Sequence, residues 1–290
     1  MTLTELIAAS TTQLSAAFVS YGHGTDNAHD EATWLILWKL GLPLDSDTEA
    51  FTRALTSDEI SSVCALVQHR ITTCKPTAYL TQEAWLQGVP FYIDERSIVP
   101  RSFIAELLAD GGFDYWLGDQ TQRVLDLCTG NGSLAVLAAM TYPYVTVVGA
   151  DISPDALAVA RINVDRHLMH KRITLIESDG LHNLPGVFDL ILCNPPYVCA
   201  SSMQALPAEF LAEPELALAG GEDGMDFIRQ LLTDAPTHMS DKAVLVLEIG
   251  NEREHFEKAF PQLEVIWLET TAGEDQVMLI TRQTLISLAH

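Results

Sequence analysis

Positively charged side chains are scarce in this sequence. The 290 residues include 16 Lys and Arg against 39 Asp and Glu, which gives a formal net charge of −23 at pH 7. A surface of that charge repels phosphate backbones, so we expect no direct binding of nucleic acid. It would attract a basic protein, although solubility alone would also account for it.

Metal-binding spacings and long hydrophobic runs are also missing. The five cysteines occur without any Cys-x-x-Cys or Cys/His pattern, so we expect reduced thiols and no metal site. No hydrophobic run is long enough to cross a bilayer, and the first residues lack the basic start of a signal peptide. We therefore expect a cytoplasmic protein with no membrane partner.

Hydrophobic residues make up 48% of the chain, which is enough for a large core. Over residues 1–85 they fall at helical spacing, which predicts a small helical domain that we interpret as a substrate-recognition module. Residues 89–94 and 97–99 read as two short strands around Glu95-Arg96, so we predict a β-hairpin linker over 86–100.

Residues 101–290 alternate between predicted strands and helices. The predicted strands are 124–127, 145–150, 173–176, 188–192 and 243–249, followed by an antiparallel pair at 264–268 and 276–281. Such alternation is typical of an α/β fold, here a mostly parallel seven-stranded sheet with helices on both faces. We expect this domain to be the catalytic one.

The stretch Asn194-Pro195-Pro196-Tyr197 ends one of these strands. Two prolines cannot continue a sheet ladder, so an amide, a carbonyl and an aromatic ring remain at the carboxyl end, where ligands bind in α/β sheets. Two acceptors and a stacking surface suit a planar –NH₂ group, either a carboxamide or the exocyclic amine of a base.

A glycine turn follows the first strand of this domain. Gly130 and Gly132 would let the backbone approach a ligand closely, and Asp151 stands where an acidic residue binds ribose hydroxyls. Asp151 could instead cap the next helix. Asp179 is placed to meet the base of the same nucleoside.

Two cofactors compete for this turn. Gly130 and Gly132 with Ala135 also match the dinucleotide fingerprint, which leaves a dehydrogenase open. Asp126, just before the turn, would repel a pyrophosphate and attract a cation. S-adenosylmethionine carries a sulfonium and an amino group with its ribose and adenine, so it suits the stretch better.

These motifs resemble the class I S-adenosylmethionine-dependent methyltransferases. The Asn-Pro-Pro-Tyr sequence together with residues 126–130, Asp-Leu-Cys-Thr-Gly, resembles the glutamine methyltransferases of the HemK/Prm group. Within it, residues 21–27, 94–96 with 99–102, and 213–214 with 216–218 are similar to the ribosomal-protein (PrmB) branch. The release-factor branch typically has Pro-Asp-Thr-Glu after the Pro-Arg pair, where this chain has Ser102-Phe103-Ile104-Ala105. Asn131 stands where the group often has Ser or Thr.

The resemblance implies methyl transfer to the side-chain amide of a glutamine in the third large-subunit ribosomal protein, a basic partner met before or during ribosome assembly. The donor would be S-adenosyl-L-methionine, leaving S-adenosyl-L-homocysteine, with no metal. It implies these roles: catalytic Asn194, Pro195 and Tyr197; cofactor-binding Asp126, Cys128, Thr129, Gly130, Gly132, Asp151, Ile152, Asp179, Gly180 and Asn194; substrate-binding Asn194, Pro195, Pro196, Tyr197 and Arg101.

Three other functions stay open. A release-factor glutamine methyltransferase would use the same site. A DNA or RNA adenine methyltransferase also uses Asn-Pro-Pro-Tyr, although the acidic charge opposes it. Outside enzymes, a non-catalytic module that binds a ribosomal protein is the alternative, and the intact motifs argue against it.

Overall fold

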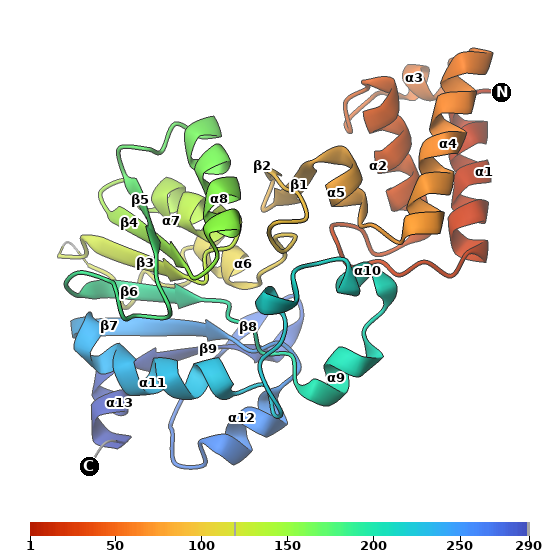
Figure 1. Ribbon diagram of the computed structural model, residues 1–290. Helices are drawn as coiled ribbons and strands as arrows, with labels where there is room; N and C mark the ends of the chain where they lie inside the picture. Colours follow the sequence, from red (N-terminus) through yellow and green to blue (C-terminus); the bar gives the residue numbers. More distant parts are fainter. Residues whose placement is uncertain (119, 289–290) are drawn as a thin grey trace. The chain divides into compact units, whose positions relative to one another are not determined.

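The computed structural model in Figure 1 describes residues 1–118 and 120–288. The chain divides into two compact units. The first comprises Met1–Ala84 together with Leu206–Glu213, and the second comprises Trp85–Ala205 and Pro214–His290. The inclusion of 206–213 in the first unit was not foreseen from the sequence.

The first unit is helical. Its helices are α1 (Leu3–Ala16), α2 (Ala28–Leu40), α3 (Thr48–Thr52), α4 (Ser57–Thr73), α5 (Thr77–Thr81) and α10 (Ala208–Leu211). Capping boxes at Thr2 with Glu5 and at Thr56 with Glu59 fix the starts of α1 and α4. The hydrophobic faces of α1, α2 and α4 form one core that includes Leu6, Ile36 and Val67.

A two-stranded hairpin follows, with its turn earlier in the chain than the predicted turn at Glu95-Arg96. The strands are β1 (Glu83–Leu86) and β2 (Val89–Tyr92), and residues 97–99 form no strand. Gln87 and Gly88 have φ of 49° and 72°, the left-handed pair that a tight hairpin turn requires. Gln-Gly is a weak turn signal, so this turn was not predicted. The segment around Glu95-Arg96 is a turn in which the Asp94 carboxylate accepts from the backbone N–H and guanidinium of Arg96.

The second unit contains the predicted seven-stranded sheet. Its strands are β3 (Arg123–Leu127), β4 (Thr146–Asp151), β5 (Ile173–Glu177), β6 (Phe188–Cys193), β7 (Met239–Glu248), β8 (Ile266–Thr270) and β9 (Gly273–Thr281). The order is β5-β4-β3-β6-β7-β9-β8, parallel except where β9 pairs antiparallel with β7 and β8. The α/β prediction is confirmed.

Helices cover both faces of this sheet (Figure 1). They are α6 (Ile104–Ala109), α7 (Ser133–Thr141), α8 (Pro154–Arg166), α11 (Asp226–His238), α12 (Arg253–Ala259) and α13 (Arg282–Leu288); α9 (Ala200–Ala205) and a 3₁₀ turn (Glu215–Ala217) lie between β6 and α11. Alternate strand residues enter opposite cores: Leu190 and Leu192 pack with α6, α7 and α8, whereas Ile191 and Cys193 pack with α11, α12 and α13.

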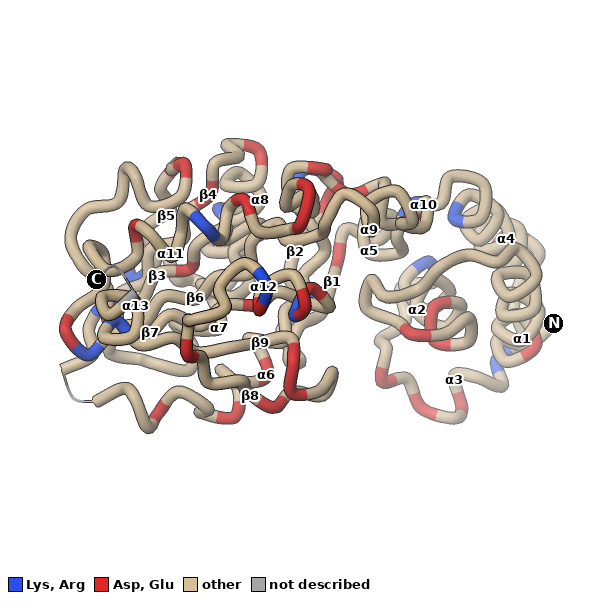
Figure 2. The backbone as a smooth tube through the Cα atoms, turned by 90° about the horizontal axis from the view of Figure 1, so that it is seen from below, with Lys and Arg blue, Asp and Glu red and all other residues tan. Residues whose placement is uncertain are grey.

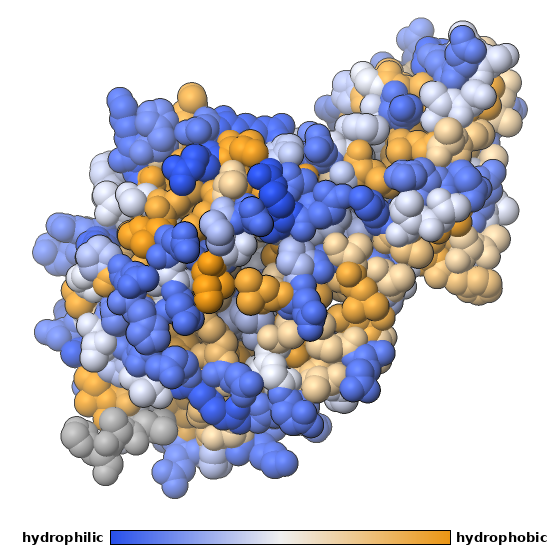
Figure 3. Space-filling view, in the orientation of Figure 1, coloured by the Kyte–Doolittle hydropathy of each residue, from blue (hydrophilic) through white to orange (hydrophobic). Residues whose placement is uncertain are grey.

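The surface is acidic and mixed in polarity. Asp and Glu outnumber Lys and Arg along the backbone of both units (Figure 2). Hydrophilic residues cover much of the face in Figure 3, with smaller hydrophobic groups among them. None of the helices that the structure describes has the length and hydrophobicity needed to cross a membrane.

Candidate active site

The parallel strands end in register at one edge of the sheet. Leu127 at the end of β3 pairs with Ala150 of β4 and with Cys193 of β6, and Cys193 pairs with Leu247 of β7. The segments that follow these strands therefore begin side by side. In an open α/β sheet this carboxyl edge is where ligands bind.

The glycine turn after β3 adopts the backbone that only glycine takes without strain. Gly130 and Gly132 have φ of 54° and 80°. A Cβ on Gly132 would lie 3.0 Å from the Cβ of Ala160, and one on Gly130 would lie 3.3 Å from Ser97 Oγ. The turn is bonded to β4 through the Thr129 N–H, which donates to the Ala150 carbonyl at 2.9 Å.

Asp126 lies buried beneath this turn, where it holds α7. Its Oδ2 accepts from Thr129 Oγ1 at 2.5 Å and from the Ala135 N–H at 2.9 Å. Its Oδ1 is buried without a hydrogen-bond partner among the described residues. Burial raises the pKa of Asp126 to about 7, so its negative charge is weaker than the sequence argument assumed.

Asp151 is bonded to the glycine turn. Its Oδ2 accepts from the Gly130 N–H at 2.9 Å and its Oδ1 from the Ser153 N–H at 2.9 Å. Ser153, and not Asp151, caps α8, because its side chain accepts from the Ala156 N–H. The half-buried carboxylate keeps lone pairs for a ligand at the edge, beside the exposed Ile152.

The next strand, β5, leads into a second turn. Asp179 is exposed there, and its carbonyl oxygen lies 2.7 Å from His182 Nδ1. Gly180 has φ of 55°, and its carbonyl accepts from Ser178 Oγ at 2.8 Å. These hydrogen bonds hold the turn, and the Asp179 carboxylate has no hydrogen-bond partner among the described residues.

The Asn-Pro-Pro-Tyr segment follows β6 directly. Pro195 is buried, and Asn194, Pro196 and Tyr197 are half-buried. Within the described part of the chain, nothing donates to or accepts from the Asn194 side chain, and no backbone N–H donates to the Pro195 carbonyl. Both oxygens are thus available to a substrate.

Three glycines enclose Tyr197. A Cβ would lie 2.7 Å from Tyr197 Cα if placed on Gly220, 2.2 Å from its carbonyl oxygen on Gly224, and 2.6 Å from ring atom Cε2 on Gly250. Side chains at these positions would displace Tyr197. No local sequence signal indicated that these glycines pack against Tyr197.

The chain after Tyr197 forms a loop whose two ends are paired. The Val198 N–H donates to the Leu218 carbonyl and the Gly220 N–H to the Val198 carbonyl, both at 2.9 Å.

Cys199, Glu252 and His255 have potential ligand atoms within 4.8 Å of one another. Hydrogen bonds already link them, with His255 Nδ1 2.6 Å from Glu252 Oε2 and the Cys199 N–H donating to Glu252 Oε1 at 3.4 Å.

Another carboxylate, Glu248, ends β7 and was not predicted as a site residue from the sequence. It is buried and accepts from Ser102 Oγ at 2.5 Å and the Phe103 N–H at 2.9 Å. Burial raises its pKa to about 7 although the nearby charge of Arg101 lowers it. Arg101 also donates to the Val99 carbonyl at 3.2 Å. Glu248 therefore fixes the Pro-Arg-Ser segment, and an acidic residue ending a strand was the signal available.

Asn163 of α8 braces the glycine turn and carried no signal in the sequence. It is fully buried, and its Nδ2 donates to the carbonyls of Asn131 at 2.8 Å and Tyr92 at 2.9 Å. Its Oδ1 accepts from the Tyr92 N–H at 2.7 Å. The Asn131 Oδ1 accepts from the Ser133 N–H at 3.1 Å, so this side chain supports the turn locally.

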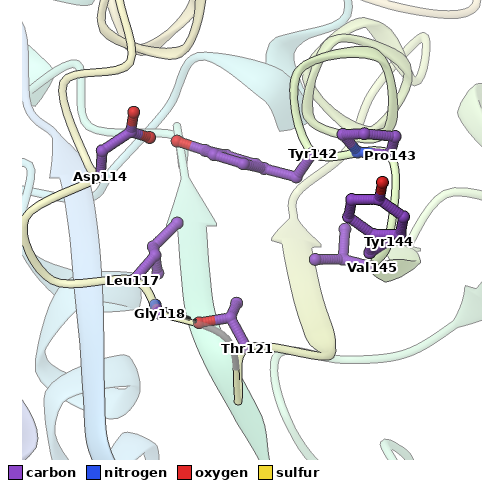
Figure 4. A pocket seen from close by; sticks show the side chains of 8 residues that line it. All are labelled: Asp114, Leu117, Gly118, Thr121, Tyr142, Pro143, Tyr144 and Val145. Atoms are coloured by element: carbon purple, nitrogen blue, oxygen red, sulfur yellow. Dashed lines mark hydrogen bonds between the residues drawn. The ribbon is translucent and has the colours of Figure 1, made fainter.

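A pocket of about 340 Å³ lies at the other end of the sheet (Figure 4). Thr121 precedes β3 and Val145 precedes β4, so the pocket is at their amino ends. The Tyr142 hydroxyl points toward the Asp114 carboxylate, and burial with that charge raises the pKa of Tyr142 above its ordinary value. The pocket is separate from the edge that carries the predicted site residues.

Known proteins match the chain over nearly its full length. A family described as "Methyltransferase small domain" matches residues 113–249. The ribosomal protein uL3 glutamine methyltransferase of Bordetella pertussis is 49% identical over 98% of this chain and 96% of its own. The protein of the same name from Burkholderia pseudomallei is 47% identical over 99% of this chain and 97% of its own.

Among solved structures, the hMettl16 catalytic domain in complex with the MAT2A 3'UTR hairpin 6 has a TM-score of 0.53 at 14% identity, over 73% of this chain and 80% of its own. At that identity the similarity concerns the fold alone. The full-length relatives place the chain more narrowly, as does the Asn-Pro-Pro-Tyr segment at the carboxyl edge of the sheet. The chain belongs to the family of ribosomal protein uL3 glutamine methyltransferases.

Proposed function

We propose that this protein transfers a methyl group from S-adenosylmethionine to the side-chain amide nitrogen of a glutamine in ribosomal protein uL3. The observation that carries the proposal is the near-full-length identity of 49% to a relative named for this activity. The available acceptors of Asn194 and Pro195 at the carboxyl edge support it chemically.

The residues at this edge fit S-adenosylmethionine as methyl donor, which is the donor that the class I methyltransferase family implies. The glycine turn offers backbone at close range, and Asp151 and Asp179 offer carboxylates to hydroxyl and amino groups. When bound, the cofactor supplies an electrophilic methyl group on a sulfonium. We assign cofactor binding to the predicted set, with Asp126 and Thr129 shaping the turn from below.

The target amide nitrogen is a poor nucleophile, because its lone pair is delocalised into the carbonyl. Asn194 Oδ1 and the Pro195 carbonyl are proposed to accept its two N–H bonds and direct the nitrogen toward the methyl group. Fixing two reactants in this way can supply about 7–11 kcal/mol of the barrier. The cofactor would give up its methyl group to the nitrogen and leave as the neutral thioether S-adenosylhomocysteine. The same acceptors would stabilise the positive charge that develops on the nitrogen, whose extra proton would pass to water.

Tyr197 is proposed to hold the plane of the amide. Its backbone and ring are fixed by Gly220, Gly224 and Gly250, so its position is set before substrate arrives. Pro196 and Arg101 are proposed to contact the substrate chain around the glutamine. Arg101 stands on the segment that Glu248 holds.

The partner is proposed to be a basic ribosomal protein, met in the cytoplasm before or during ribosome assembly. The net charge of −23 favours such a partner and disfavours direct contact with nucleic acid. We propose that the helical domain predicted over residues 1–85 recognises the protein target.

The test is to incubate the purified protein with labelled S-adenosylmethionine and one candidate substrate at a time. The candidates are purified uL3, a release factor and ribosomal RNA. Label in a uL3 glutamine is expected. Label in the release factor would favour the release-factor branch, and label in RNA adenine would favour a base methyltransferase.

A further inference from the structure

Two stretches of the helical unit have no part in the proposed chemistry: residues 20–27 and the segment 206–213, which we call the anchor segment. They meet at Arg70, whose side chain is fully buried. Arg70 Nη1 donates to Glu209 Oε1 at 3.0 Å and Nη2 donates to the Ser20 carbonyl at 3.0 Å. The Ser20 N–H donates to the same Glu209 oxygen at 3.1 Å. Because the groups are shielded from water, breaking one of these bonds costs more than breaking a surface ion pair.

Glu31 completes the network from α2. Its Oε1 accepts from Arg70 Nε at 2.8 Å and its Oε2 from Thr25 Oγ1 at 3.2 Å. One buried guanidinium thus serves two buried carboxylates. Removing either partner would leave a buried group unpaired, which is the expensive case.

A second contact lies at the other end of the anchor segment. The Phe210 ring packs on His23 with 4.3 Å between centroids, and Glu213 Oε2 lies 3.4 Å from His23 Nε2. His23 and Glu213 are both buried. A Cβ on Gly22 would lie 3.2 Å from Phe210, so the glycine at 22 lets the two stretches approach.

The anchor segment is the middle of the loop that begins at Tyr197. The loop closes on itself through the bonds of Val198 with Leu218 and Gly220. These bonds adjoin the backbone of Tyr197, against which Gly220 and Gly224 pack. The ends of the loop belong to the second unit and its middle belongs to the first.

We infer that Glu209 and Phe210 are positioning residues: by fixing the anchor segment to residues 20–27 and Arg70, they restrict the loop and so hold Tyr197 in place for methyl transfer. The role in transfer rests on the proposed function, whereas the order of the loop does not. The functional consequence is a change in turnover with protein substrate and not in cofactor affinity, since Asp151 and the glycine turn lie outside the loop.

Glu209→Gln tests this in the full-length protein, with Glu215→Gln as the matched control. Glu215 is an exposed glutamate of the same loop outside the anchor segment, so the control makes the same chemical change without touching Arg70. Three measurements are made: kcat and KM with intact uL3, Kd for S-adenosylmethionine, and amide hydrogen exchange at Val198 and Gly220. We expect Glu209→Gln to lower kcat about tenfold or more and to speed exchange at both amides, with Kd changed less than twofold.

Turnover and loop exchange equal to those of Glu215→Gln would overturn the inference, as would a loss of cofactor affinity as large as the loss of turnover. If Glu209→Gln unfolds the helical unit, seen as lost protection throughout α4, Phe210→Leu replaces it under the same criteria, because it leaves the buried charges intact. Absence of uL3 methylation by the unaltered protein would overturn the proposed function alone, and loop exchange would still decide the anchor.

Discussion

Asn194 is the residue whose chemistry the proposed reaction depends on most directly. Asn194→Ala removes an acceptor and leaves a substrate N–H unpaired in a desolvated site, at a cost of about 1–3 kcal/mol. The rate of methyl transfer in a single-turnover experiment should fall at least about tenfold, since about 1.36 kcal/mol of barrier changes the rate by a factor of ten. Cofactor Kd, measured by calorimetry, should change little. Asn194→Asp keeps one acceptor oxygen and should retain measurable activity; transfer by Asn194→Ala at the unaltered rate would place the active site elsewhere.

Glu248 predicts a pH dependence of stability. Its pKa rises from an ordinary 4.5 to about 7 in the folded protein, because burial disfavours its charge. Between these values the folded protein holds a proton that the unfolded chain has lost, so the free energy of unfolding should fall as pH rises through this window. Glu248→Gln keeps an acceptor for Ser102 and cannot titrate. In urea unfolding, the free energy of unfolding of this variant should fall with pH less steeply than that of the unaltered protein, by up to about 1.4 kcal/mol per pH unit. Equal slopes in both proteins would contradict the assignment.

At the scale of elements, the glycines around Tyr197 should be as important as the motif itself. Gly250→Ala puts a Cβ 2.6 Å from the Tyr197 ring and imposes φ of 51° on alanine, which costs about 1–2 kcal/mol before any clash. We expect turnover at least about tenfold lower, at 1.36 kcal/mol per factor of ten, with a lowered melting temperature.

The control for that change is Gly118→Ala, because a Cβ there meets nothing within 4 Å and the backbone is not left-handed. It should leave both turnover and melting temperature close to those of the unaltered protein. Full activity in Gly250→Ala would show that the ring position of Tyr197 does not matter.

The sequence predicted the elements better than their tertiary partners. Short hydrophobic runs and glycine turns are local signals, so the seven strands could be predicted. The hairpin turns at Gln87-Gly88, and Gln-Gly is a weaker turn signal than Asn-Gly. The predicted turn at Glu95-Arg96 was therefore wrong.

Long-range polar contacts left no comparable signal. Asn163 reaches a loop 32 residues away, and Arg70 pairs with Glu209 across 139 residues. For the site, the strand ends and the residue types could be predicted from the sequence. The structure shows that Asp126 is buried under the turn. It also shows that Ser153 caps α8, a role that the sequence had left open for Asp151. The roles of the site residues remain predictions.

At the scale of the whole molecule, the net charge of −23 should govern how the protein meets its substrate. Attraction between an acidic enzyme and a basic protein is screened by salt, with a Debye length of about 10 Å at 0.1 M. The KM for uL3 should therefore rise several-fold when salt is raised from about 0.05 M to about 0.3 M, at nearly constant kcat. Cofactor Kd, titrated over the same range, is the control and should change less. A KM independent of salt would leave the acidic surface without a role in substrate binding.

The most direct test of the central claim is methyl transfer from labelled S-adenosylmethionine into uL3, followed by mass spectrometry of the labelled peptide, for the unaltered protein beside Asn194→Ala. We expect one methyl group on the side-chain amide of a glutamine, formed by the unaltered protein and much more slowly by the variant. Label on another residue type, in RNA, or in equal amount with Asn194→Ala would contradict the account.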